Sequence, residues 1–117
     1  MSALRPEFTV ASPRAVRRAS ILGLLLFAAS APALAATHTV TITGMLFEPA
    51  TVHAVPGDRI VWLNRDLVPH TASALDRSFD SGRIDPGQQW SLVVQAAGVV
   101  GYECAYHPSM QGRLEVR

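Results

Sequence analysis

Short apolar runs separated by turn residues make up the chain from residue 36 onward. The runs are rich in valine, isoleucine, threonine and aromatic residues, and no stretch of twelve residues shows a convincing 3.6-residue apolar repeat. Glycine, proline and aspartate separate the runs, as in 56–58 and 85–87. The pattern predicts seven strands: His38–Thr43, Thr51–Val55, Arg59–Asn64, His70–Leu75, Gln89–Gln95, Val99–Cys104 and Arg113–Arg117.

The third of these runs, Arg59–Asn64, shows which side chains we expect to face the core. Ile60, Trp62 and Asn64 share one face of the run, and the other face is also largely apolar. Seven short strands at this spacing predict an all-β fold, a two-sheet antiparallel sandwich. The segment 76–87 fits either an eighth strand or a loop with a helical turn.

The first third of the chain has the three parts of a secretory signal. Residues 1–20 carry four arginines and one acid, the run Ile21–Ala33 is almost wholly apolar, and Ala33–Ala35 is a small-x-small cleavage signature. The sequence therefore predicts a signal peptide over residues 1–35, a single domain over residues 36–117 and a periplasmic location.

Two alternatives exist for this segment. An uncleaved membrane anchor is disfavoured because 13 apolar residues fall short of the roughly 20 that span a bilayer. The pair Arg17-Arg18 suggests a second export route, the twin-arginine route, in which a folded protein crosses the membrane. Such signals usually carry a bulky apolar residue two places after the pair, where this chain has Ser20. Sec export is therefore favoured, with no stable membrane insertion after cleavage.

Removal of the signal changes the charge of the protein. The full chain has a formal net charge of +1, whereas residues 36–117 contain six arginines, no lysine and eight acids, a net charge of −2. No basic patch remains that could hold a phosphate backbone, so nucleic acid is excluded as a partner. The 82 residues after the predicted cleavage site have room for one small domain, which we expect to be a monomer.

The single cysteine of the chain cannot form an internal disulfide. A lone thiol in an oxidising compartment is reactive unless something occupies it, as a bound metal would. Cys104, His107 and Met110 follow one another at intervals of three residues between two predicted strands. So short a loop directs the three side chains toward one point. Upstream, Pro69-His70 supplies a second imidazole 34 residues before the cysteine.

The ligand types then select the metal. One thiolate, two imidazoles and one thioether form a soft set, and thioethers bind zinc, magnesium and calcium poorly. Two histidines and one cysteine with a weak axial methionine are typical of copper electron-transfer sites. Taken singly, each of these residue types is more often a packing or surface residue. The prediction depends on their coincidence, because Cys104, His107 and Met110 fall within seven residues.

Several motifs of the chain resemble one known family, the cupredoxins, in its amicyanin and plastocyanin branch. The similar segments are Trp62–Asp66 followed by Pro69-His70, Phe79–Gly82 followed by Pro86-Gly87, Tyr102–Gly112 with its C-x-x-H-x-x-M spacing, and Met45–Pro49. The C-x-x-H-x-x-M spacing is similar to amicyanin, whereas plastocyanins place the methionine further on. The resemblance covers nearly all of residues 37–117.

The resemblance implies a Greek-key β-sandwich of about seven to eight strands with one type 1 copper ion, Cu(I)/Cu(II), at one end. It implies a one-electron carrier with His70 as the mid-chain ligand, Cys104 as the thiolate and Met110 as the axial thioether. His107 would be the ligand whose ring edge reaches the surface. Thr71 stands where the family usually has asparagine, so we expect a different tie between the two ligand loops. Val100 also replaces an aromatic residue.

The family arrangement further implies that redox protein partners dock transiently at the His107 end. An apolar patch suited to brief docking would gather there, comprising Met45, Leu46, Phe47, Pro69, Pro86 and Pro108. Several of these residues could instead cover the core, and Met45 is a competing axial ligand that fits the motif less well than Met110.

A second copper site is a hypothesis that follows from the predicted cleavage. A chain starting at Ala36-Thr37-His38 could bind Cu(II) through its amine, two amides and an imidazole. The simpler interpretation is that His38 begins the first strand. His53 is expected to face solvent.

Two other functions compete with electron transfer. One is copper delivery or sequestration without electron shuttling, although no methionine-rich or histidine-rich tail supports it. The other is an adhesion sandwich with an incidental cysteine. An enzyme is disfavoured because a four-ligand site has no open position for a substrate and no separate nucleophile and base pair is found.

Overall fold

The computed structural model describes residues 3–4, 11–13, 23 and 34–117. The apolar run predicted for the signal lies, except for Gly23, outside the described residues. Contacts divide the chain into two units, Met1–Ala31 and Pro32–Arg117, and the second unit carries the fold. Within the described ranges, no helix is long and apolar enough to cross a membrane.

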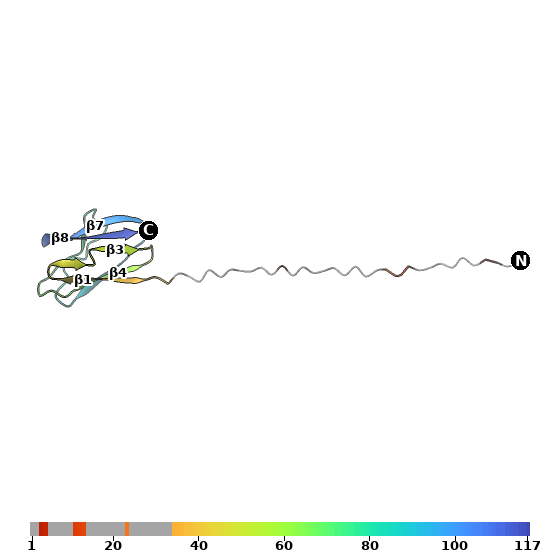
Figure 1. Ribbon diagram of the computed structural model, residues 1–117, viewed down its shortest axis with the longest axis horizontal. Helices are drawn as coiled ribbons and strands as arrows, with labels where there is room; N and C mark the ends of the chain where they lie inside the picture. Colours follow the sequence, from red (N-terminus) through yellow and green to blue (C-terminus); the bar gives the residue numbers. More distant parts are fainter. Residues whose placement is uncertain (1–2, 5–10, 14–22, 24–33) are drawn as a thin grey trace. The chain divides into compact units, whose positions relative to one another are not determined.

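The second unit is a sandwich of two four-stranded sheets, as predicted (Figure 1). One sheet has the order β2-β1-β4-β6 and the other the order β3-β8-β7-β5. The strands are β1 (Thr37–Thr43), β2 (Leu46–Glu48), β3 (Thr51–Ala54), β4 (Arg59–Asn64), β5 (Ser73–Ala74), β6 (Gln89–Val93), β7 (Gly98–Cys104) and β8 (His107–Val116).

The sheets are mixed, so the prediction of a purely antiparallel sandwich is wrong. β1 runs parallel to β4, and β3 runs parallel to β8. The reason is the Greek-key path of the chain. After the β1–β2 hairpin the chain crosses to the other sheet for β3 and returns as β4 beside β1, in the same direction. Turn residues mark where a strand ends, but they do not reveal which sheet the chain enters next.

Three elements differ from the predicted strands. The predicted strand His70–Leu75 is reduced to β5, Ser73–Ala74. The eighth strand is β2, and the segment 76–87 forms a loop held by the isolated bridges His70–Ile84 and Ser73–Asp80. β8 begins at His107, six residues before the predicted start. The segment after Cys104 is therefore not an open loop but the tight end of a β-hairpin.

The core lies between the sheets and is centred on aromatic side chains. Ile60, Trp62 and Asn64 are fully buried, which confirms the predicted inner face of β4. Trp62 meets Tyr102 edge to face at a ring-centroid distance of 5.4 Å. Gly112 on β8 lies directly against this tyrosine, and a β-carbon there would overlap the phenol ring. Burial raises the pKa of Tyr102 to about 12.

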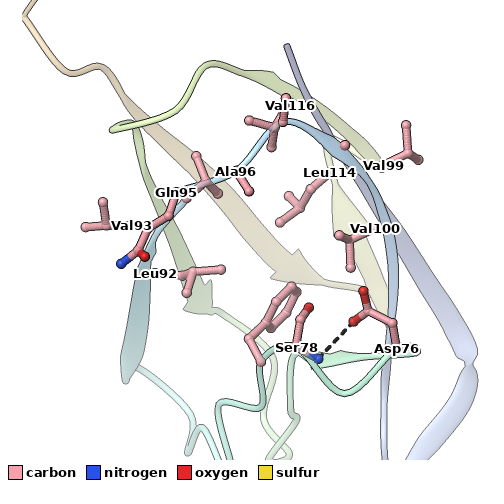
Figure 2. Close-up of a pocket in the computed structure, with 14 residues that line it drawn as sticks. Asp76, Ser78, Leu92, Val93, Gln95, Ala96, Val99, Val100, Leu114 and Val116 are labelled. Atoms are coloured by element: carbon pink, nitrogen blue, oxygen red, sulfur yellow. Dashed lines mark hydrogen bonds between the residues drawn. The ribbon is translucent and has the colours of Figure 1, made fainter.

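At the end of the sandwich away from the predicted ligands, a hollow of about 560 Å³ opens between the sheets. Figure 2 shows Leu92, Val100 and Leu114 pointing into it and Val99 pointing away. None of the predicted metal ligands lines this hollow. The predicted metal ligands therefore lie at the opposite end of the sandwich.

Candidate metal centre

The hairpin between β7 and β8 positions two of the predicted ligands. Cys104 ends β7 and His107 begins β8, and the two residues are paired across the hairpin. A register shift between Glu103 and Cys104 locally bends the pairing. Only two residues separate the strands, so the cysteine sulfur and the histidine ring are held on the same side of a short, hydrogen-bonded turn.

His70 comes from the long connection between β4 and β5, and its backbone is fixed. Its N–H donates to the carbonyl of Ile84 at 3.1 Å, and the Ile84 N–H donates back at 2.8 Å. The buried Asn64 side chain donates to the carbonyls of Val68 and Ile84 at 2.9 and 3.0 Å. The end of β4 thus anchors the segment that presents the first imidazole.

These elements bring the three nitrogen and sulfur donors together. The Cys104 Sγ lies 3.6 Å from Nδ1 of His70 and 3.8 Å from Nδ1 of His107. All three donor atoms lie within 4.8 Å of one another. His70 and Cys104 are 0% exposed, Met110 is 2% exposed, and His107 is half-buried. Met45, the competing axial residue, is 39% exposed, and this exposure favours Met110.

Thr71 ties the two ligand segments together. Its backbone N–H points at the Cys104 Sγ, 3.4 Å away, and its Oγ1 accepts the Ala105 N–H at 2.7 Å. The Ser73 hydroxyl donates to Asp80, so the 2.9 Å contact between the two hydroxyls requires Thr71 to donate to Ser73. The expected tie between the ligand loops is therefore present, made by a hydroxyl rather than by an amide.

Asp66 fixes the orientation of the His70 ring. Its Oδ2 lies 2.8 Å from Nε2 of His70, and the same carboxylate accepts the N–H groups of Gly44 and Met45. Burial opposes ionisation of Asp66, but the hydrogen bonds from Met45, His70 and Gly44 outweigh it and lower the pKa of this carboxyl. With Nε2–H donated to a carboxylate, Nδ1 keeps its lone pair for a metal.

Two predicted features lie away from this centre. His53 is largely exposed and pairs with Glu115 at 3.0 Å. His38 lies in β1 with its Nε2 2.9 Å from Asp58, and the Ala36 nitrogen donates to the same carboxylate. A Cu(II) ion bound by the amine, the amides and the His38 ring would have to break these contacts.

The donor set fits copper. One buried sulfur and two imidazole nitrogens lie within 4.8 Å of one another, a buried thioether follows three residues after His107 in β8, and the sulfur has a backbone N–H donor suited to a thiolate. A Greek-key sandwich with this set at one end defines the cupredoxin class of copper proteins.

Comparison with known proteins gives the family. A family model described as copper binding proteins of the plastocyanin/azurin family matches residues 34–117. Amicyanin from Paracoccus denitrificans is 34% identical over 82 residues, covering 66% of this chain and 63% of the relative. Pseudoazurin from Paracoccus pantotrophus is 34% identical over 95 residues, covering 73% of this chain and 65% of the relative. The chain thus spans less than two thirds of the length of these relatives.

Solved structures agree with the sequence match. A Cu(I) form of an amicyanin variant superposes with a TM-score of 0.66 at 27% identity, over 69% of this chain and 82% of that chain. A purple cupredoxin from Nitrosopumilus maritimus shares the fold with a TM-score of 0.65 at 23% identity, over 68% of this chain and 99% of that chain. The chain belongs to the plastocyanin/azurin family of copper-binding proteins, and copper is its cofactor.

The test of the Thr71 tie compares two substitutions. Thr71→Ala removes the acceptor of the Ala105 N–H and is expected to lower the free energy of unfolding by about 1–3 kcal/mol. It should also change the reduction potential of the copper form. Thr71→Ser keeps the hydroxyl and should retain most of the stability. Urea unfolding of the apoprotein and voltammetry of the copper form measure both effects. Equal losses in the two variants would show that the hydroxyl is not the tie.

Asp66→Asn tests the orientation of the first imidazole. Loss of the carboxylate charge behind Nε2 is expected to weaken copper binding by about tenfold to a hundredfold. Competition with a chelator of known affinity measures this change. Asp76→Asn is the matched control, because Asp76 is exposed and its carboxylate accepts only from the Ser78 segment. An unchanged affinity in Asp66→Asn would mean that the carboxylate does not support His70.

Proposed function

We propose that this protein is an exported one-electron carrier whose copper ion is bound by His70, Cys104, His107 and Met110. The observation that carries the proposal is the unequal burial of these residues: His70, Cys104 and Met110 are buried, whereas His107 is half-buried. A closed, buried ligand set limits rearrangement between the two copper oxidation states, and one half-buried ligand offers a path for the electron. The set leaves no open position for a substrate, so we propose transport rather than catalysis.

The relatives support the same role. The match to copper binding proteins of the plastocyanin/azurin family covers the whole sandwich, and amicyanin, pseudoazurin and plastocyanin are among the relatives. Periplasmic location and Sec export with cleavage after Ala35 belong to the proposal. They rest on the basic, apolar and small-residue pattern of residues 1–35.

The partner surface differs from the sequence prediction by the loss of one residue and the gain of three. Phe47 is 3% exposed and packs edge to face on Tyr102, so it covers the core and does not belong to a docking patch. Exposed apolar side chains do occur on the segments bonded to Asp66 and Asn64 and on the ligand hairpin. They are Met45 (39%), Leu46 (56%), Leu67 (94%), Val68 (42%) and Tyr106 (50%).

We propose that this group, with Pro69, Pro86 and Pro108, surrounds the His107 ring and receives redox partners. Its position is supported by the hydrogen bonds that join Met45 to Asp66 and Val68 to Asn64, because Asp66 also contacts the His70 ring, which lies 5.3 Å from the ring of His107 between centroids. Leu67, Val68 and Tyr106 were not expected from the sequence, because nothing in their neighbourhood distinguishes an exposed apolar residue from a core one.

The copper proposal is tested by adding Cu(II) to the protein that starts at Ala36. An intense visible band from thiolate-to-copper charge transfer is expected, together with a reversible one-electron wave in voltammetry. The band should vanish in Cys104→Ser and persist in His53→Ala, a histidine outside the cluster. A colourless protein contradicts a type 1 site. A coloured protein without a reversible wave would instead indicate copper delivery or sequestration.

Electron self-exchange between oxidised and reduced copies tests the docking surface without a known partner. Leu46→Lys places a like charge on both facing patches and should slow exchange by about threefold to tenfold at low salt. Val99→Lys, at a 59% exposed position on β7, is the matched control and should leave the rate unchanged. Equal effects of the two lysines would contradict docking through the His107 end.

A further inference from the structure

A carboxylate at the end of the sandwich away from the copper ligands contacts the predicted cleavage site. Asp58 is 4% exposed and lies in the turn between β3 and β4. Its Oδ1 accepts the N–H of Ala36 at 2.9 Å, and its Oδ2 accepts the N–H of Val55 at 3.1 Å. The Nε2 of His38 lies 2.9 Å from the same Oδ2. No metal-ligand role explains this cluster.

Ala36 is fixed from both sides of its α-carbon. Its nitrogen donates to Asp58, and its carbonyl accepts the Arg59 N–H at 2.9 Å. The next residue, Thr37, already pairs with β4. In contrast, Leu34 is 95% exposed and precedes the first strand. The peptide bond between Ala35 and Ala36 therefore lies at the point where the chain enters the ordered sheet.

We propose that Asp58 is the receptor for the α-ammonium group that signal cleavage creates on Ala36. The inference rests on the proposed cleavage after Ala35. Hydrolysis of that bond by an export peptidase consumes one water and leaves a carboxylate on Ala35 and an amine on Ala36. The amine takes one proton from solvent and becomes an ammonium. The same nitrogen that donated a neutral N–H to Asp58 then carries a positive charge at an unchanged position.

The change strengthens an existing contact. The ionised Asp58 already makes a charge-assisted hydrogen bond with the neutral N–H of Ala36, and the ammonium adds a Coulomb attraction to it at the same donor–acceptor distance of 2.9 Å. Asp58 is ready to accept it, because the hydrogen bonds from His38, Val55 and Ala36 lower the pKa of its carboxyl. Cleavage thus completes the folded domain: the mature chain gains an ion pair that the precursor cannot form.

The charged and titratable groups around this contact come from four elements. His38 lies on β1, Arg59 begins β4 and reaches the Ser91 hydroxyl, and His53 on β3 pairs with Glu115 on β8. Arg117 lines a shallow hollow with His53 and Asp58. No other carboxylate is in contact with the Ala36 nitrogen among the described residues. Asp58 is therefore the group expected to bind the ammonium.

The proposal predicts a specific dependence on pH. Pairing with Asp58 raises the pKa of the α-amino group above its usual value of about 7.7–8.0. The stabilisation is therefore complete below that range and is lost as pH rises through the raised folded-state value. It is also lost at low pH, as Asp58 becomes protonated.

The experiment compares the copper-loaded chain starting at Ala36 with the same chain acetylated at its amine. Each is made with Asp58 and with Asp58→Asn. At pH 6.5, acetylation should lower the folding equilibrium constant about fivefold to tenfold with Asp58 present and less than twofold in Asp58→Asn. By linkage, the amine pKa should be raised by about 0.7–1 unit. The difference should fade by pH 9.5.

Equal unfolding of the free and acetylated chains at pH 6.5, or an amine with its usual pKa, would overturn the proposal. The amine pKa is measured on the unsubstituted protein, so the test holds even if Asp58→Asn fails to fold. Mass analysis of the exported protein tests the premise, and a terminus other than Ala36 would also overturn it. The visible copper band reports separately on the proposed function, since Asp58 is remote from the ligands.

Discussion

The bridge made by Thr71 is the contact on which the copper site depends. A site of this kind joins two parts of the chain that are 34 residues apart, namely the segment of His70 and the hairpin of Cys104 and His107. Thr71 joins them by two hydrogen bonds. Its backbone N–H donates to the sulfur of Cys104, and its hydroxyl oxygen accepts the N–H of Ala105. Without this bridge, the sandwich would bring the two segments close but would not fix the sulfur against the imidazole.

The rest of the architecture supports that bridge from both sides. Asp66 and Asn64, at the end of β4, hold the His70 segment by its ring and by its backbone neighbours. The extended pairing of β8 holds the other segment, so that the hairpin carrying His107 continues a strand anchored in the core. The ligands consequently sit on connections that are short or hydrogen-bonded, which is the condition for a site that binds a metal with little reorganisation.

The sequence predicted the metal-binding residues better than the strands and hydrogen bonds that surround them. Cys104, His107 and Met110 were identifiable because their spacing is local, and Trp62 because strand alternation is local as well. β2 was missed because a three-residue strand with one buried side chain has no detectable period. The parallel pairs were missed because strand direction depends on crossings between sheets. The role of Asp66 could have been suspected from its place four residues before His70, but its hydrogen bonds to the turn at Gly44 depend on tertiary contacts.

Crystal structures of the apoprotein and the Cu(II) form test most directly whether the fold prearranges the site. We expect the donor atoms of His70, Cys104 and His107 to move by less than about 0.5 Å on binding copper. The hydrogen bond from the Ala105 N–H to the Thr71 hydroxyl should be present in both forms. A bridge that forms only with copper bound, or a ligand hairpin that rearranges on binding, would contradict a prearranged site.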